Sequence, residues 1–231
     1  MMGEVAFQGF KPELLKFLSG LRANNNRAWF EAHRGDYETH LLEPAREFVV
    51  SMGECLKTLG SDIHAEPRVR GSIFAINRDT RFSKDKTPYK TYLDLWFWQG
   101  NGLSRERPGY FFRLTPESLT LGAGMHAFSD ATLHRYRNAV LDPVQGEKLT
   151  AVGEQLNGQG VQVAGQAYKK VPNGLPADHP RAEWLRYGAL FAAIEQPVPQ
   201  EIFSDQLPRV CERQFRRVAP LQQWLVDQLA D

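Results

Sequence analysis

The sequence predicts an α+β protein in which an antiparallel sheet of about five or six strands is covered by helices, with helical regions at both ends of the chain. Apolar residues recur at helical spacing near both ends. In the middle third, short β-branched or aromatic runs alternate with Gly, Pro and charged residues, as strands and turns do. Thr115-Pro116-Glu117 joins two of these runs and is short enough only for antiparallel neighbours.

The N-terminal third predicts helices. Pro12 suits a first helical turn, and the leucines that follow share one face of a helix that ends near Asn24. Asn24-Asn25-Asn26 predicts a turn, after which helical character resumes at Arg27. An apolar stripe from Leu41 to Leu59 predicts a long helix, and Pro44 within it predicts a kink or a restart.

Strands are predicted for the short apolar runs at Val69, 73–76, 92–98, 109–114, 118–121 and 190–194. Ser129 and Asp142 can each cap a following helix, and Asp178-His179-Pro180 repeats that signal. Residues 200–229 predict two further helices separated near Pro220. No repeat or linker divides the chain, so we expect a single α+β domain over residues 1–231.

Composition limits the possible partners. The 231 residues are 42% apolar, which is enough for a sizeable core, and their net charge of +1 provides no overall attraction to nucleic acid or to an anionic membrane. Cys55 and Cys211 are too few for a disulfide framework and lack metal-ligand spacing. No apolar run approaches the roughly 20 residues of a membrane helix, and residues 1–10 have neither the basic n-region nor the apolar h-region of a signal peptide. We therefore expect a cytoplasmic protein without a membrane partner.

Residues 77–90 concentrate the positive charge and are the segment most suited to binding. They carry a local excess of +3, which leaves the remainder of the chain at −2. With arginines just before the segment, they predict a cradle for a phosphate or carboxylate group of a small molecule. The predicted anion ligands are Arg78 and Arg81 for bidentate contacts, Lys84, Lys86 and Lys90 for less directional charge, Arg70 from the preceding strand, and Arg113 as a partner from a later strand. The predicted supporting residues are Asp79, Asp85, Ser83, Tyr89 and His179.

Two alternatives remain open. In a purely structural loop, Asp79 and Asp85 would neutralise the arginines and no ligand would bind. A nucleic-acid binding module would need exposed aromatic residues and a second basic patch on the same face as the first. The candidates for these two features are Trp96, Trp98, Tyr110 and Phe112, for which core packing is the favoured role, and Arg209, Arg213, Arg216 and Arg217.

Other motifs give no specific chemistry. The six histidines lack metal-ligand spacing, so we expect no metal site. Asp178 could orient His179 as a general base, although a helix cap is favoured. Ser83 lies in no nucleophile motif, and Gly122-Ala123-Gly124 is neither a dinucleotide fingerprint nor a P-loop but is typical of a strand end. The cofactor is thus undefined, and the chain could be a binder or an enzyme.

Four separated blocks carry a family resemblance. They are the string from Arg78 to Lys90, Asn24-Asn25-Asn26-Arg27-Ala28-Trp29-Phe30, Gly122-Ala123-Gly124-Met125 and Asp178-His179-Pro180. Together they resemble the family known as domain of unknown function 2461, over almost the whole chain. The chain departs from the family pattern at His126, where another aromatic residue is expected, and at Gly188, where a basic residue is frequent. The resemblance implies no particular reaction, but a hallmark string so rich in charge favours binding or a buried polar network.

Overall fold

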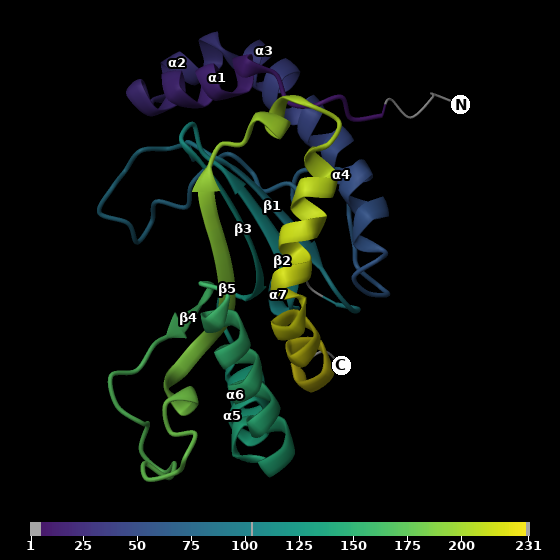
Figure 1. Cartoon of the computed structure of the whole chain (residues 1–231). Helices are drawn as coiled ribbons and strands as arrows, with labels where there is room; N and C mark the ends of the chain where they lie inside the picture. Colours follow the sequence, from purple (N-terminus) through teal and green to yellow (C-terminus); the bar gives the residue numbers. More distant parts are fainter. Residues whose placement is uncertain (1–5, 103, 230–231) are drawn as a thin grey trace.

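The computed structural model describes residues 6–102 and 104–229 (Figure 1). Its α-helices are α1 (Pro12–Ala23), α2 (Arg27–Ala32), α3 (Arg34–Asp36), α4 (Glu43–Leu56), α5 (Asp130–Leu141), α6 (Pro143–Gly158) and α7 (Leu207–Leu229). Its strands are β1 (Leu93–Trp98), β2 (Gly109–Leu114), β3 (Ser118–Met125), β4 (Gln162–Gln166) and β5 (Tyr187–Pro197). Short π or 3₁₀ turns are η1 (Tyr37–Leu42), η2 (Ser104–Glu106), η3 (Trp184–Arg186) and η4 (Gln200–Phe203).

The five strands form one antiparallel sheet in the order β1-β2-β3-β5-β4, which confirms the predicted α+β class. The tight connection between β2 and β3 is the predicted one. There the Thr115 hydroxyl oxygen accepts a hydrogen bond of 2.9 Å from the backbone N–H of Ser118. None of the helices in the described ranges has the length and apolar composition that crossing a bilayer requires.

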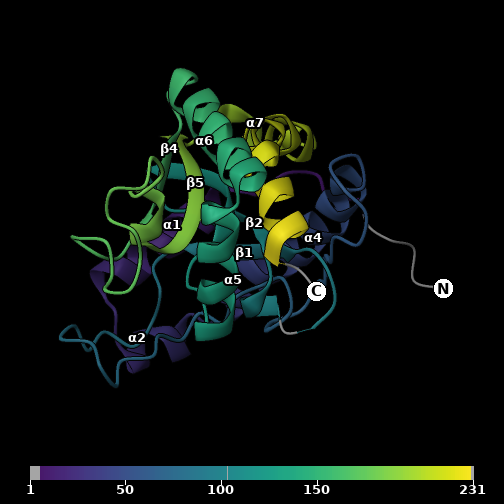
Figure 2. The same ribbon diagram turned by 90° about the horizontal axis from the view of Figure 1, so that it is seen from below.

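Helices cover one face of the sheet. Phe48 of α4 lies 5.0 Å from Phe112, and Phe215 of α7 lies 5.0 Å from Tyr110, measured between ring centroids. Figure 1 shows α4 and α7 on the same side of the sheet, and Figure 2 gives the view from below. Because side chains alternate along a strand, Trp96 and its partner Phe111 on β2 point to the opposite face of the sheet, which these helices leave open.

Ser129 caps α5 and Asp142 caps α6, as predicted. At the predicted turn before Arg27, Asn26 caps α2 by accepting a hydrogen bond from the backbone of Trp29. The expected restart at Pro44 is confirmed, because the π-helical turn η1 leads into α4 and Pro44 occupies the first turn of that helix.

Three sequence-based predictions of secondary structure are wrong. Val69 and residues 73–76 form isolated β-bridges and a tight turn instead of strands. The segment at Asp178-His179-Pro180 forms turns, which end in the 3₁₀ turn η3 instead of an α-helix. Pro220 lies inside α7 and does not divide it. Apolar residues continue at helical spacing on both sides of Pro220, and their burial outweighs one missing backbone hydrogen bond.

Candidate functional site

A cavity of about 860 Å³ lies between the segment that precedes β1 and the open face of the sheet. Four cationic side chains line it, namely Arg70, Arg78, Arg81 and Lys90. Among the described lining residues, Asp79 is the only acid. The aromatic part of the lining comes from Phe74, Trp96 and His126. The cavity therefore combines positive charge with aromatic surface.

A tight turn brings Arg70 to the cavity. The backbone N–H of Arg70 donates to the carbonyl of Ile73 at 2.9 Å, and the hydroxyl of the fully buried Ser72 accepts from the backbone of Glu66 at 2.9 Å. This turn holds Arg70 at φ +67°, in the left-handed region that side chains other than glycine rarely adopt. Within residues 6–102 and 104–229, no hydrogen bond or ion pair involves the Arg70 guanidinium.

Trp96 and His126 belong to an aromatic group on the open face. The indole N–H of Trp96 donates to the carbonyl of Ser104 at 2.9 Å, which fixes its ring. The imidazole of His126 lies 5.8 Å from the Trp96 ring and 5.1 Å from each of the Phe111 and Phe191 rings, measured between centroids. Desolvation among these rings lowers the pKa of His126 below 6.5, and the positive charge of Arg113 acts in the same direction.

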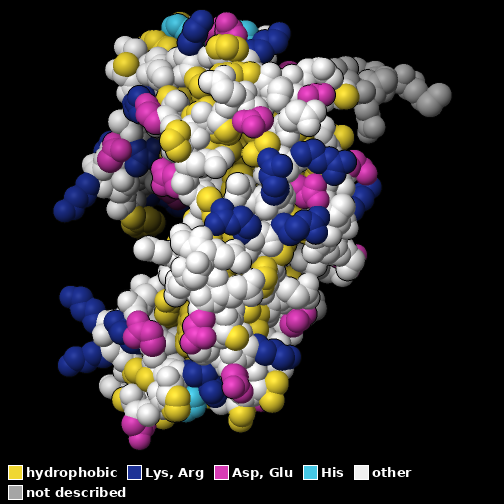
Figure 3. Space-filling view, in the orientation of Figure 1, with side chains coloured by type: hydrophobic (Ala, Val, Ile, Leu, Met, Phe, Trp, Pro, Cys, Tyr) yellow, Lys and Arg dark blue, Asp and Glu magenta, His cyan; other side chains and the backbone are white. Residues whose placement is uncertain are grey.

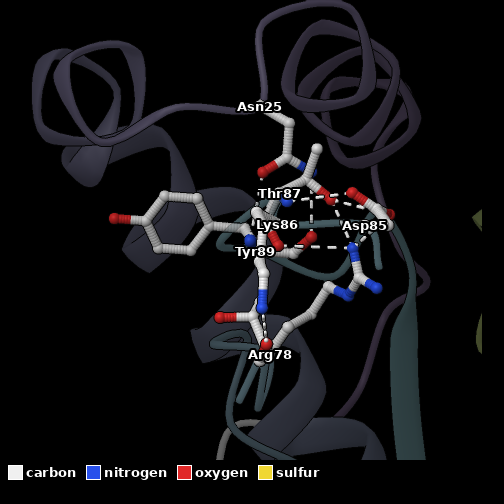
Figure 4. A network of polar contacts seen from close by, with 7 residues as sticks. Asn25, Arg78, Asp85, Lys86, Thr87 and Tyr89 are labelled. Atoms are coloured by element: carbon white, nitrogen blue, oxygen red, sulfur yellow. Dashed lines mark hydrogen bonds and ion pairs between the residues drawn. The ribbon is translucent and has the colours of Figure 1, made fainter. Parts of the chain in front are cut away.

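Arg78 is held by residues of its own loop (Figure 4). Its guanidinium donates to the carboxylate of Asp85 at 2.5 Å and to the hydroxyl of Thr87. The backbone N–H of Thr87 donates to Asp85 at 2.9 Å. These hydrogen bonds, first that of the Thr87 backbone and then that of Arg78, lower the pKa of Asp85 from 3.8 to about 2. Arg78 thus stabilises the loop as well as lining the cavity.

Hydrogen bonds also hold this loop at its base and between its own residues. The Asn25 side chain forms two hydrogen bonds with the backbone of Tyr89, and the Lys86 ammonium donates to the carbonyl of Thr80 at 2.8 Å (Figure 4). Arg81 donates twice to Asp79, at 3.0 and 2.6 Å, and this pair lowers the pKa of the Asp79 carboxyl. Both members of that pair are largely exposed, so water screens their attraction.

The predicted site residues separate into two groups. The structure brings Arg70, Arg78, Asp79, Arg81 and Lys90 together around the cavity. The predicted residues that do not line it are Ser83, Lys84, Asp85, Lys86, Tyr89, Arg113 and His179.

Several of the outlying residues have other contacts. The guanidinium of Arg113 pairs with Asp94 at 2.6 Å, and the Tyr89 ring stacks on Phe30 at 4.3 Å between centroids. His179 accepts a hydrogen bond of 3.1 Å from the backbone of Arg181 in the connection before η3.

Sequence patterns did not reveal the aromatic floor of the cavity, which is formed by Phe74, Trp96 and His126. The signal available was the alternation in β1, which sends Trp96 to the face opposite Leu95. Placing His126 beside Trp96 further requires the pairing of three strands. No group of three or more potential metal ligands occurs among the residues that the structure describes.

The second basic patch lies elsewhere. Arg209 and Arg216 of α7 pair with Glu212 at 3.2 and 2.6 Å, and Figure 3 shows Lys and Arg side chains gathered over the middle of this helix. In Figures 1 and 2 the loop formed by residues 78–88 projects on the opposite side of the molecule from α7. The two basic patches therefore do not share a face.

The aromatic residues proposed as a stacking platform do not share a face either. All four are buried, as core packing predicts, with Tyr110 and Phe112 under the helices and Trp96 on the open side. The described part of the chain thus lacks the arrangement that a single nucleic-acid footprint requires.

Comparison with known proteins identifies a family but no relative of established activity. A family model described as "Conserved hypothetical protein (DUF2461)" matches residues 13–224. Neither a curated protein nor a solved structure matches the chain. The family match covers the whole sheet and the basic loop, which is the segment from Arg78 to Lys90. The resemblance inferred from separated motifs is therefore confirmed. The chain belongs to the DUF2461 family of conserved hypothetical proteins.

Proposed function

We propose that the protein binds a phosphorylated or carboxylated small molecule in the 860 Å³ cavity. Its volume falls within the range of roughly 300–1,000 Å³ that is typical of small-molecule pockets. Among the residues that the structure describes, four cationic side chains and one carboxylate line it, so its local charge is complementary to an anion although the whole chain is nearly neutral.

The observation that carries this proposal is that the Arg70 guanidinium has no internal partner among the described residues. Arg70 lines the cavity from a backbone conformation that is unfavourable for its type, and its side chain makes no hydrogen bond or ion pair with the described residues. The Arg70 side chain is exposed, and neither backbone preference nor internal pairing favours arginine over other polar residues at this position. Guanidinium groups bind phosphate and carboxylate through two parallel N–H donors, which gives the side chain a role in ligand binding.

The other cations differ in their availability. Arg81 shares an exposed ion pair with Asp79, and such a pair gives way to a ligand at little cost. Arg78 is bound to Asp85 and Thr87, so it contributes positive charge and loop rigidity rather than a free donor pair. We therefore assign direct contact with the anion to Arg70 and Arg81.

Isothermal titration calorimetry with inorganic phosphate and with citrate tests this function. We expect at least one of these anions to bind, and Arg70→Ala or Arg81→Ala to weaken its binding by about tenfold or more. Lys84→Ala is the matched control, because Lys84 is an exposed cation of the same loop that does not line the cavity. Binding of neither anion, or equal losses in all three variants, would contradict the proposal.

A further inference from the structure

We infer that the anionic ligand carries a planar aromatic ring, which packs on the aromatic floor of the cavity while its charged group meets Arg70. This inference rests on the proposed function and names the class of its ligand. An aryl phosphate, an aryl carboxylate and a nucleotide all belong to this class.

The cavity is larger than an anionic group alone requires. A single phosphate or carboxylate group occupies only a small part of a cavity of about 860 Å³. Pockets of this volume enclose molecules of many atoms and bind most of their surface through apolar and aromatic contacts. The ligand must therefore have a body in addition to its charged group.

Away from the cations, the cavity lining carries aromatic side chains. Phe74 lies at the cavity wall with 36% of its surface exposed, although large apolar side chains are usually buried. The Lys90 ammonium lies 4.8 Å from the centroid of the Phe74 ring, so a cation is positioned over an aromatic face. Trp96 and the exposed His126 continue the aromatic surface across the lining.

The sheet itself makes room for this aromatic surface. The aromatic group extends from Trp96 through His126 to Phe111 and Phe191, with centroid separations of 5.1–6.5 Å between neighbours. At Gly122 an added Cβ would lie 2.3 Å from the Phe111 ring, so only glycine lets this ring lie against the strand. An aromatic ligand can extend the group through offset or edge contacts.

Charge and aromatic surface thus adjoin in one cavity. An aliphatic phosphate would satisfy the cations but would gain only hydrophobic contact from the floor. A ring with an anionic substituent uses both parts, since its quadrupole also interacts with the edges of neighbouring rings and with a nearby cation such as Lys90.

Calorimetric titration with phenyl phosphate, cyclohexyl phosphate and inorganic phosphate tests the inference. We expect phenyl phosphate to bind about tenfold more tightly than inorganic phosphate, and several-fold more tightly than cyclohexyl phosphate. Phe74→Ala and His126→Ala should each remove most of the advantage of phenyl phosphate and leave the affinity for inorganic phosphate nearly unchanged.

Phe203→Ala provides the matched control. Phe203 is an aromatic residue with 37% of its surface exposed, close to the value for Phe74, and it is not part of the cavity lining, so its removal should leave all three affinities unchanged. Thermal melts of each variant confirm folding, and His126→Ala keeps the test decisive if Phe74→Ala fails to fold.

The outcomes distinguish failure of the aromatic ligand from failure of anion binding. Equal affinities for phenyl and inorganic phosphate, or for phenyl and cyclohexyl phosphate, overturn the aromatic ligand and leave anion binding standing. A preference for phenyl phosphate that persists in both Phe74→Ala and His126→Ala also overturns it. Failure of the wild-type protein to bind any of these phosphates or citrate, or binding that does not depend on Arg70, overturns the proposed function itself.

Discussion

The side chain of Asn25 pairs with the backbone of Tyr89 in both directions. Its amide N–H donates to the Tyr89 carbonyl at 2.9 Å, and its carbonyl accepts from the Tyr89 N–H at 3.0 Å. The backbone also closes the loop next to this contact, because Lys90 N–H donates to Ile76 at 2.7 Å. The turn between α1 and α2 thereby fixes the base of the basic loop and with it the position of Lys90.

Asn25→Ala should lower the free energy of unfolding by about 1–3 kcal/mol, because it leaves a partly buried backbone N–H and carbonyl without partners. Urea denaturation measures this change. Asn24→Ala is the control, since the exposed Asn24 side chain bonds only to a carbonyl of its own helix. Equal midpoints for the two variants would show that the Asn25 contact does not hold the loop.

Arg70→Asn should raise stability while it weakens anion binding. Asparagine tolerates the left-handed conformation better than arginine, so we expect a gain of roughly 0.5–1 kcal/mol in the free energy of unfolding. No internal hydrogen bond or ion pair to a described residue is lost in exchange. Thermal denaturation and titration with phosphate measure the two effects. A variant that is less stable than the wild type would mean that Arg70 has a structural role.

Asp85→Asn should change the acid dependence of stability. Because folding lowers the Asp85 pKa from 3.8 to about 2, the ionised carboxylate contributes stability that is fully present above pH 3.8 and is lost as the pH falls towards 2. The wild type should therefore lose more stability than Asp85→Asn across this interval. Denaturation curves at several acidic pH values provide the comparison, and parallel losses in the two proteins would contradict the assigned hydrogen bonds.

Gly122→Ala should be strongly destabilising. The new methyl group would lie 2.3 Å from both the Ala192 carbonyl oxygen and the Phe111 ring, so strand or ring must move, at a cost of about 2–3 kcal/mol. Gly158→Ala, where an added Cβ would meet no atom within 4 Å beyond its chain neighbours and the nearby backbone of its own helix, should instead stabilise α6 by up to about 1 kcal/mol. Chemical denaturation distinguishes the two, and a neutral Gly122→Ala would show that the open face can repack.

The sequence predicts those parts of the fold that depend on local pattern. Alternation reveals β1 and β2, whereas β4 was missed because four of its five residues are polar or small, Val163 being the exception, and they include Gly165 at φ +116°. The break expected at Pro220 is absent because burial along α7 outweighs a local preference.

The same limit applies to the candidate site. Charge density alone identifies the basic segment, but the pairing of Arg78 with Asp85 depends on the path of the loop. The contact between Trp96 and His126 depends on strand order across the sheet. Long-range pairing of this kind leaves no pattern in a single segment.

A crystal structure obtained with phenyl phosphate tests the central claim most directly. The account predicts the phosphate group within hydrogen-bond distance of the Arg70 guanidinium and the ring against Phe74 and His126. A cavity that contains only water at saturating ligand, with Arg70 turned into the solvent, would contradict it.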